Sequence, residues 1–378
     1  MRKPEETNIL ELVTGFASNH LAPNVAAWSS DSSTKSKLYK DAAELGVFGL
    51  EIPVLSGGLG LPFSIKAKVC EKLAATDFGF AMSLINTHNV GVRLIKSASP
   101  ELQAKYLPQL LAGKMSACTA LTEPSAGSDF AAISCRATKM DKGWTLSGEK
   151  TWIVNARHAG LAVVFAQCGA QKGSDQIGAF LIDLNAVGIT RYPIDTEFSQ
   201  ASMGTGGFVL DSVYINDDHI LIPPGTAFKE ILKEINGARI YVAAMCVGML
   251  ENALEQVNAY GDERETFGKP LSEQPSWKCV LDDVKADLWV VRLLLLEAIE
   301  QYELGLDAQL LAARSKIKAV EICQYHLPRL LHAMGAEGLK SKYCFSRHIA
   351  ATQIAGLTDG ATSMLKARVQ KMTAANTK

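Results

Sequence analysis

The feature that most constrains the fold is a change in the residue pattern, between helical and strand-like, that occurs twice along the chain. Residues 5–113 follow helical spacing, whereas residues 115–222 contain short β-branched and aromatic runs broken by turns. The remainder returns to long amphipathic stretches. Because strands and helices do not alternate, this order argues against a doubly wound sheet. The 378 residues therefore predict an α+β protein with domains at 1–114, 115–222 and 223–378.

The helical blocks have boundaries that the sequence marks. Asp31 is expected to begin a capped helix, the Gly/Pro-rich stretch 52–62 is expected to be a loop, and Pro100 and Gly113 should begin and end another helix. The last third predicts an antiparallel bundle followed by further helices. The expected helical stretches there are 227–261, 274–304, 307–334, 343–355 and 360–375.

The composition argues against nucleic-acid binding, membrane attachment and a metal site. With 38 basic and 39 acidic residues, the net charge of -1 supplies no broad field for nucleic acid or an anionic membrane. No run of 18 apolar residues exists, and the start MRKPEETNILELV has no apolar signal core, so we expect a cytoplasmic protein without membrane attachment. The eight cysteines form no CxxC pair, which predicts buried free thiols and no metal site.

Three polar stretches are candidates for chemistry, and each has an ordinary alternative. The segment ALTEPSAGSD (120–129) offers free N–H groups and hydroxyls to a planar ligand or a pyrophosphate, or is a plain loop. In GEKTWIVN (148–155), Trp152 alone is more typical of a core. In RETFGKPL (264–271), Arg264 could hold a phosphate or belong to a simple polar turn.

Together, these three stretches resemble the signatures of the acyl-CoA dehydrogenase family, and the agreement extends from about residue 5 to 375. The resemblance implies an N-terminal helical domain, a central β-barrel-like domain and a C-terminal four-helix bundle. It also implies FAD, a homotetramer, and introduction of an α,β double bond into an acyl thioester. The acyl group would be carried by CoA or by a carrier protein, and an electron-transfer flavoprotein or another acceptor would take the electrons.

The resemblance assigns the catalytic base to Asp359, where many members have a glutamate before a glycine. This base would remove the substrate's α-proton while flavin N5 takes the β-hydride. The N–H of residue 359 would help to hold the thioester oxygen. The alternative is that Asp359 caps the helix that follows. The positions implied for substrate binding are Ser128, Arg239, Asp359 and Gly360.

The resemblance also implies a set of flavin positions, and the chain departs from the family at several of them. Val154 and Ala361 replace common hydroxyl residues, and the aspartate at 359 is one methylene shorter than the usual glutamate. A second family position for the base is empty, because Gly237 and Ala238 stand there. The implied flavin positions are Leu121, Thr122, Ser128, Trp152, Val154, Arg264, Phe267, Gln274, His332, Gly335 and Ala361.

These departures leave two other functions open. A flavin oxidase of the same fold would fit an aspartate base, as the nitroalkane oxidases use, and would react quickly with oxygen. A non-catalytic acyl-binding scaffold would take up no FAD. His88 and Glu123 are polar residues near the expected pocket, and structural roles are expected for both.

Overall fold

The computed structural model describes residues 4–29, 32–198 and 200–375, and the chain divides into two compact units. The first unit holds most of the N-terminal helices and the β domain. The second unit holds the C-terminal helices together with residues 63–78. The three-domain division expected from the sequence stays a prediction. The units are Met1–Phe16, Pro23–Pro62 and Gly79–Glu234 for the first, and Ala17–Ala22, Phe63–Phe78 and Ile235–Lys378 for the second.

The helices of the first unit begin and end close to their sequence signals. Ser99 Oγ accepts a hydrogen bond from the Leu102 N–H at 3.3 Å, which caps α5 one residue before Pro100. Gly113, with φ 62°, follows the end of α5. The expected cap at Asp31 lies outside the described residues. The helices are α1 (Pro4–Phe16), α2 (Ser32–Glu44), α4 (Phe78–Ser97) and α5 (Pro100–Leu111).

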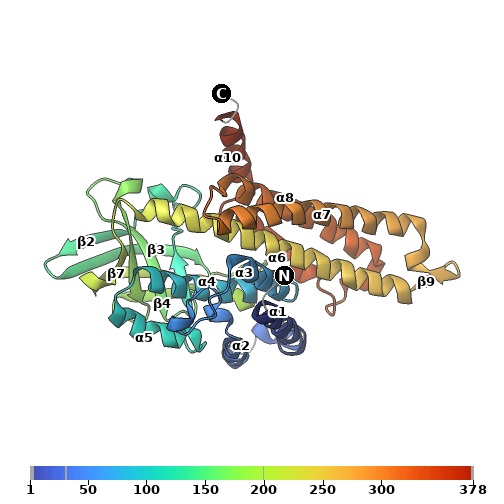
Figure 1. Cartoon of the computed structure of the whole chain (residues 1–378), viewed down its shortest axis with the longest axis horizontal. Coiled ribbons are helices and arrows are strands. Elements are labelled where there is room, and N and C mark those ends of the chain that lie inside the picture. The colour runs from blue at the N-terminus through green and yellow to red at the C-terminus, as the bar shows by residue number, and fades with distance from the viewer. Residues whose placement is uncertain (1–3, 30–31, 199, 376–378) are drawn as a thin grey trace. The chain divides into compact units, whose positions relative to one another are not determined.

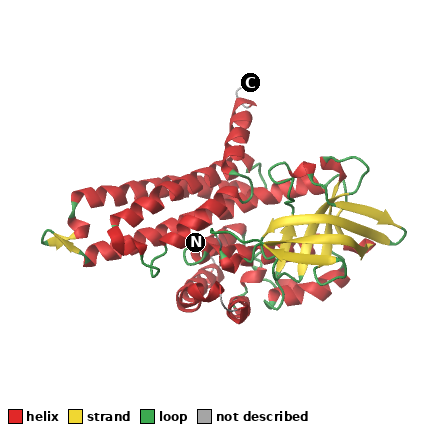
Figure 2. Cartoon of the chain, turned by 180° about the vertical axis from the view of Figure 1, so that it is seen from behind, coloured by secondary structure: helices red, strands yellow, loops and turns green. Residues whose placement is uncertain are grey.

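The β domain is one mixed sheet of eight strands, shown in yellow in Figure 2. Its strand order is β6-β7-β3-β2-β4-β5-β8, and β1 pairs with β4 in parallel. The strands are β1 (Ala117–Ala120), β2 (Arg136–Met140), β3 (Gly143–Ile153), β4 (Leu161–Gln167), β5 (Ile177–Asp183), β6 (Ile189–Pro193), β7 (Gly206–Asn216) and β8 (Ile220–Ile222).

An apolar cluster lies against this sheet. Leu146, Phe180 and Phe208 are fully buried in it, and the Trp144 ring lies 5.4 Å from the ring of Phe180. The long pair β3–β7 changes register twice, once between Leu146 and Gly148 and again between Lys150 and Ile153. A register change bends a strand and re-aims its side chains. The second change falls inside the GEKTWIVN stretch.

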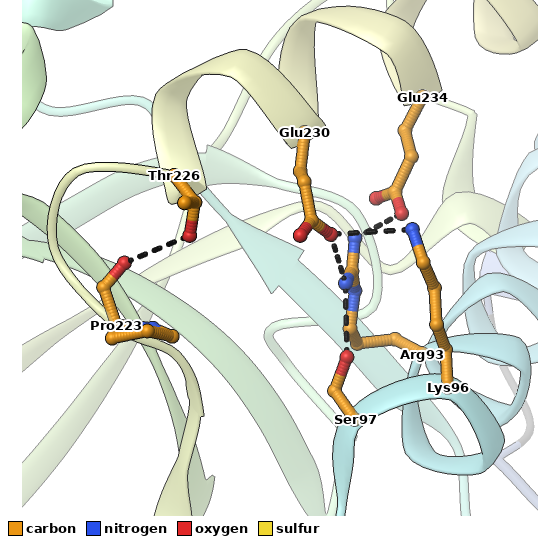
Figure 3. A network of polar contacts seen from close by, with 7 residues as sticks. All are labelled: Arg93, Lys96, Ser97, Pro223, Thr226, Glu230 and Glu234. Atoms are coloured by element: carbon orange, nitrogen blue, oxygen red, sulfur yellow. Dashed lines mark hydrogen bonds and ion pairs between the residues drawn. The ribbon is translucent and has the colours of Figure 1, made fainter.

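A charged network joins α4 to the start of α6 within the first unit (Figure 3). Arg93 is almost fully buried and forms ion pairs with Glu230, at 2.8 Å, and with Glu234. Lys96 also pairs with Glu230, and Arg93 donates to the Ser97 hydroxyl at 3.1 Å. Because the buried cation has two anionic partners, this network fixes the first turns of α6 against α4.

The second unit is the expected helical bundle. In Figure 1, α7 and α8 lie side by side, and α8 also packs against α9 and α10. The short strands β9 (Glu265–Thr266) and β10 (Lys269–Pro270) form a hairpin between α6 and α7. The helices are α3 (Phe63–Ala74), α6 (Ala227–Glu263, in this unit from residue 235), α7 (Pro275–Glu303), α8 (Gln309–Ala333), α9 (Phe345–Leu357) and α10 (Thr362–Ala375).

The cysteines are free thiols, as expected, and most are buried. Cys279 differs, because it is exposed on α7. Burial raises the pKa of the Cys118 and Cys344 thiols to about 12 in each case, so both stay protonated and inert at neutral pH. In the described part of the chain, no helix is long and apolar enough to cross a membrane.

Candidate active site

The loop after β1 is held by a buried ion pair. The Lys150 ammonium donates to Glu123 Oε1 at 2.7 Å and to the Leu121 carbonyl at 3.0 Å, and neither charged side chain is exposed by more than 3%. The Glu123 carboxylate also accepts the N–H groups of Ser134 and Cys135. Glu123 is therefore structural, as expected. This arrangement leaves Ser128 exposed on the loop.

The neighbouring strand presents an aromatic ring to solvent. Trp152 has φ 57° and is 58% exposed, at the second register change of β3. The Thr151 N–H donates to the Thr122 carbonyl at 3.0 Å, so the loop and this bulge lie side by side. Left-handed backbone is uncommon for a bulky residue. Trp152 is thus not a core residue, and Val154, next in the bulge, is half-buried.

Asn155 anchors the end of this bulge in the helices of the first unit. Its side-chain N–H groups donate to the Ser83 carbonyl at 2.7 Å and to the Ala117 carbonyl at 2.9 Å. Its amide oxygen accepts from the Ser83 hydroxyl, which also contacts the Tyr39 hydroxyl. All four residues are buried. A fully satisfied polar network of this kind rigidifies what it holds, here the backbone that aims Trp152.

In the second unit, the segment between α9 and α10 carries Asp359. Its φ of 54° is left-handed, and Gly360 follows with φ 108°. The Arg239 guanidinium donates from Nε to the Asp359 carbonyl at 3.1 Å, and the Lys316 ammonium donates to the Gly360 carbonyl at 2.6 Å. The half-buried Ala361 comes next. Arg239, Asp359 and Gly360 therefore lie together, and Lys316 joins them.

Burial and the neighbouring charges act on the pKa of the Asp359 carboxyl in opposite directions. Burial raises the pKa of the Asp359 carboxyl above its usual range, while the positive charges of Lys316 and Arg239 act to lower it. Burial also lowers the pKa of Lys316 to about 8 and that of Arg239 to about 10. A carboxyl with a raised pKa is a stronger base once it is ionised.

The remaining implied flavin positions lie at the β9–β10 end of the bundle. Phe267 has φ 52° and is 98% exposed, and Arg264 and His332 are also exposed. Gln274 donates to the Thr266 carbonyl at 3.2 Å, which closes the turn. The Trp277 indole N–H donates to the Ala333 carbonyl at 3.2 Å, so the start of α7 lies against the end of α8, where Gly335 follows.

These residues fit a flavin. An exposed indole on left-handed backbone, beside a loop with open hydroxyls, suits a planar ring that carries many acceptors. An exposed arginine and phenylalanine on a hairpin suit a phosphate and an aromatic group. When bound, FAD would supply the hydride acceptor for an oxidation. Within the first unit, Leu121, Thr122, Ser128 and Trp152 would hold it.

Sequence reasoning missed Lys316. It lies on the buried stripe of α8, four residues after Ala312 and four before Val320. A lysine in the middle of an apolar helical stripe is itself a signal, because a buried charge is costly unless something compensates for it. His88, by contrast, is a packed residue as expected: it is buried, and its ring nitrogens contact the Phe48 carbonyl at 3.0 Å and the Glu51 carboxylate at 3.2 Å.

Comparison with known proteins shows the family of the chain. Three family models match in order: the acyl-CoA dehydrogenase N-terminal domain over residues 3–114, the middle domain over 118–213 and the C-terminal domain over 227–373. The chain therefore belongs to the acyl-CoA dehydrogenase family. It has that family's fold, and it is an FAD-dependent oxidoreductase that acts on acyl-CoA.

The relatives agree over nearly the whole chain. The short-chain specific acyl-CoA dehydrogenase of Homo sapiens is 26% identical, covering 94% of this chain and 87% of its own length. The subunit CarC of a caffeyl-CoA reductase–Etf complex from Acetobacterium woodii is 27% identical, covering 90% of both. The structure of butyryl-CoA dehydrogenase from Megasphaera elsdenii superposes with a TM-score of 0.91, at 26% identity and 99% coverage of both chains.

Proposed function

We propose that Asp359 is the base of this acyl-CoA dehydrogenase and that the loop around it is its catalytic centre. The observation that carries the proposal is the pair of buried cations, Arg239 and Lys316, on the two consecutive carbonyls of Asp359 and Gly360. Among the described residues, the groups that act on the Asp359 carboxylate are the charged side chains of Lys316 and Arg239, and α10 begins only at Thr362, which favours a base over a helix cap. Burial raises the pKa of this carboxyl, as base chemistry requires.

The chain's residues would divide the work as follows. The Asp359 carboxylate takes the α-proton of the acyl thioester, and the resulting carboxylic acid is neutral. The N–H of residue 359 donates to the thioester oxygen, where negative charge develops as the proton leaves. The oxidation also removes the β-hydrogen with its electron pair, for which bound FAD would supply the acceptor. In the first unit, the bulge at Trp152 and the Thr122 loop would hold the cofactor.

The shorter acid defines the class of substrate that we propose. A carboxylate one methylene closer to the backbone reaches a different point, and a misplacement of about 1 Å can cost on the order of 100-fold in rate. We therefore propose a small, branched, cyclic or oxygenated acyl group in place of a straight fatty acyl chain. The carrier that we propose for it is CoA or, in a biosynthetic pathway, a carrier protein.

Anaerobic reduction of the bound flavin tests this function directly. Short, branched and aromatic acyl-CoAs are added without oxygen, and the band near roughly 450 nm is followed. Bleaching by one class names the acyl group, and Asp359→Asn should keep the flavin but slow bleaching by about 100- to 10,000-fold. A near-full rate in Asp359→Asn would show that Asp359 is a cap. A protein that takes up no FAD would contradict the enzyme itself.

The acceptor and the assembly belong to the same proposal. The relative from Acetobacterium woodii is named as part of a complex with Etf, which supports an electron-transfer flavoprotein as the acceptor here. Slow reoxidation by oxygen is expected, and fast reoxidation would point to the oxidase alternative. The exposed Phe267, Trp289 and Leu293 of the second unit support a homotetramer. The cytoplasmic location expected from the sequence stays a prediction.

A further inference from the structure

Lys316 has an environment that packing alone does not explain. Its side chain has no exposed area, although it lies on the buried stripe of α8 between Ala312 and Ala319. Burying an ammonium costs several kcal/mol before its partners compensate. An apolar residue would fill this position without that cost. The charge of Lys316 therefore needs an explanation other than packing.

Two cations from different helices hold one short segment. Lys316 of α8 donates to the Gly360 carbonyl at 2.6 Å, and Arg239 of α6 donates to the Asp359 carbonyl at 3.1 Å. Arg239 is itself oriented by the Asn236 side-chain oxygen at 2.9 Å. The left-handed backbone of Asp359 is strained, and such a conformation persists where its surroundings over-determine it. These two contacts do so.

Charged and titratable groups act on Lys316 from α6 and from the segment before α10. The Asp359 carboxyl faces it from the segment before α10, and Arg239 and the Cys246 thiol face it from α6. Arg368 of α10 faces Arg239 in turn. Among these groups, Asp359 is the carboxylate, so the two buried cations have one anionic side chain between them. Lys316 is mainly protonated at pH 7, since burial lowers its pKa only to about 8.

We propose that Lys316 is a positioning residue for the reaction: its ammonium, held on the Gly360 carbonyl, fixes the left-handed Asp359 turn and supplies the positive charge that keeps the Asp359 carboxylate ionised. The inference rests on the proposed role of Asp359 as the base. Lys316 touches neither proton nor hydride. The α-proton passes from the substrate carbon to the Asp359 carboxylate, and Lys316 keeps its own proton throughout.

The pH dependence of flavin reduction separates charge from packing. Bleaching should fall as the pH drops through the pKa of Asp359, because the protonated acid is no base. The acid limb is the pH range in which the bleaching rate falls as the pH is lowered. An opposite charge nearby lowers a carboxyl pKa by about 1–3 units, so Lys316→Met should move the acid limb to higher pH by about one unit. At a pH below the wild-type limb, the variant should then be about tenfold slower than wild type. Lys316→Gln removes the charge but keeps a donor, and Lys316→Arg keeps both.

The charge-removing variants, Met and Gln, should therefore share the shifted limb, and Lys316→Arg should keep the wild-type limb. Lys66→Met is the matched control: Lys66 is another buried lysine of this unit, on α3 beside the rings of Phe63 and Tyr241. It should leave the limb in place. Flavin content and the thermal midpoint of every variant are measured first. If Lys316→Met does not fold, Lys316→Gln takes its place.

Two outcomes would overturn the inference. An unshifted acid limb in Lys316→Met and Lys316→Gln would mean that the charge does not act on Asp359. The same shift in Lys66→Met would mean that any buried lysine has this effect. Asp359→Asn is run beside them, so that failure of the proposed base is recognised separately. If Asp359→Asn is inactive and the limb stays unshifted, only the role of Lys316 is wrong.

Discussion

At the scale of single residues, the backbone of Asp359 matters as much as its carboxylate. A left-handed aspartate with its carbonyl held by Arg239 points its short side chain in one fixed direction. Its glycine neighbour tolerates φ 108° without strain, and a Cβ there would come within 3.0 Å of Met364. The shorter acid is thus set in a rigid turn.

Lengthening this acid should therefore harm the enzyme. Asp359→Glu keeps the charge but moves the carboxylate outward by one methylene, so flavin should be retained while reduction by the native acyl-CoA slows by roughly 100-fold. The measurement is anaerobic bleaching at saturating substrate, with Asp359→Asn as the fully impaired reference. An unchanged rate with the native acyl-CoA would argue against a substrate class set by the length of this acid, whereas a gain on straight-chain acyl-CoAs would support it.

A second residue-scale prediction concerns stability in acid. His348 is buried and donates from Nε2 to the Ala75 carbonyl at 3.2 Å, and burial lowers its pKa to about 3. The unfolded chain takes up a proton near pH 6.5, but the folded state does not. Stability should thus be full above about pH 6.5 and fall toward pH 3, by up to about 1.4 kcal/mol per pH unit.

His348→Gln removes this titration but keeps a donor for Ala75. Denaturant midpoints of both holoenzymes at pH 7 and pH 5 measure the effect. The gap between the two pH values should be smaller in the glutamine variant. Equal gaps would show that other groups control the acid sensitivity.

At the scale of elements, the bulge in β3 links the sheet to the flavin positions. The sheet alone would aim Trp152 by simple alternation, but the register change after Lys150 turns it outward. Lys150 and Glu123 tie this bulge to the loop after β1. The bulge and the loop are therefore coupled, and a substitution that displaces one of them should also displace the other.

Breaking the Lys150–Glu123 pair should release the cofactor. Lys150→Met leaves the Glu123 carboxylate buried without its cation, and removing one partner of a buried pair costs about 3–5 kcal/mol. We expect a lower thermal midpoint and a weaker FAD affinity. The affinity is measured through the fluorescence of released flavin. The double variant with Glu123→Gln should recover part of the loss. Unchanged FAD affinity in Lys150→Met would separate the loop from the cofactor.

At the scale of the whole molecule, the outer face of α7 carries an apolar stripe. Trp289, Leu293 and Leu296 are 66%, 49% and 58% exposed and follow helical spacing, whereas Leu288 and Leu295 of the same helix face the core. An open groove of about 370 Å³ between α6 and α7 borders Trp289 and is lined by charges of both signs. Large exposed apolar stripes mark interaction surfaces.

A charge in this stripe should therefore weaken the proposed tetramer. Leu293→Lys should lower the mass measured by light scattering to a dimer or monomer, because a buried lysine at an interface lacks a partner. Leu55→Lys, on a fully exposed residue of the first unit, is the control and should leave the mass unchanged. The wild-type mass surviving in Leu293→Lys would place the subunit contacts elsewhere.

The sequence by itself determined the order of helices, sheet and bundle, because periodicity and turn residues act locally. Pro100, Gly113 and the three family stretches can all be recognised without knowledge of tertiary contacts. It also pointed to Asp359, through a resemblance of spacing. Only the tertiary structure decided that Trp152 is exposed, since a register shift depends on which strand lies opposite. Likewise, only folding brought Lys316 and Arg239, from distant helices, to the carbonyls around Asp359.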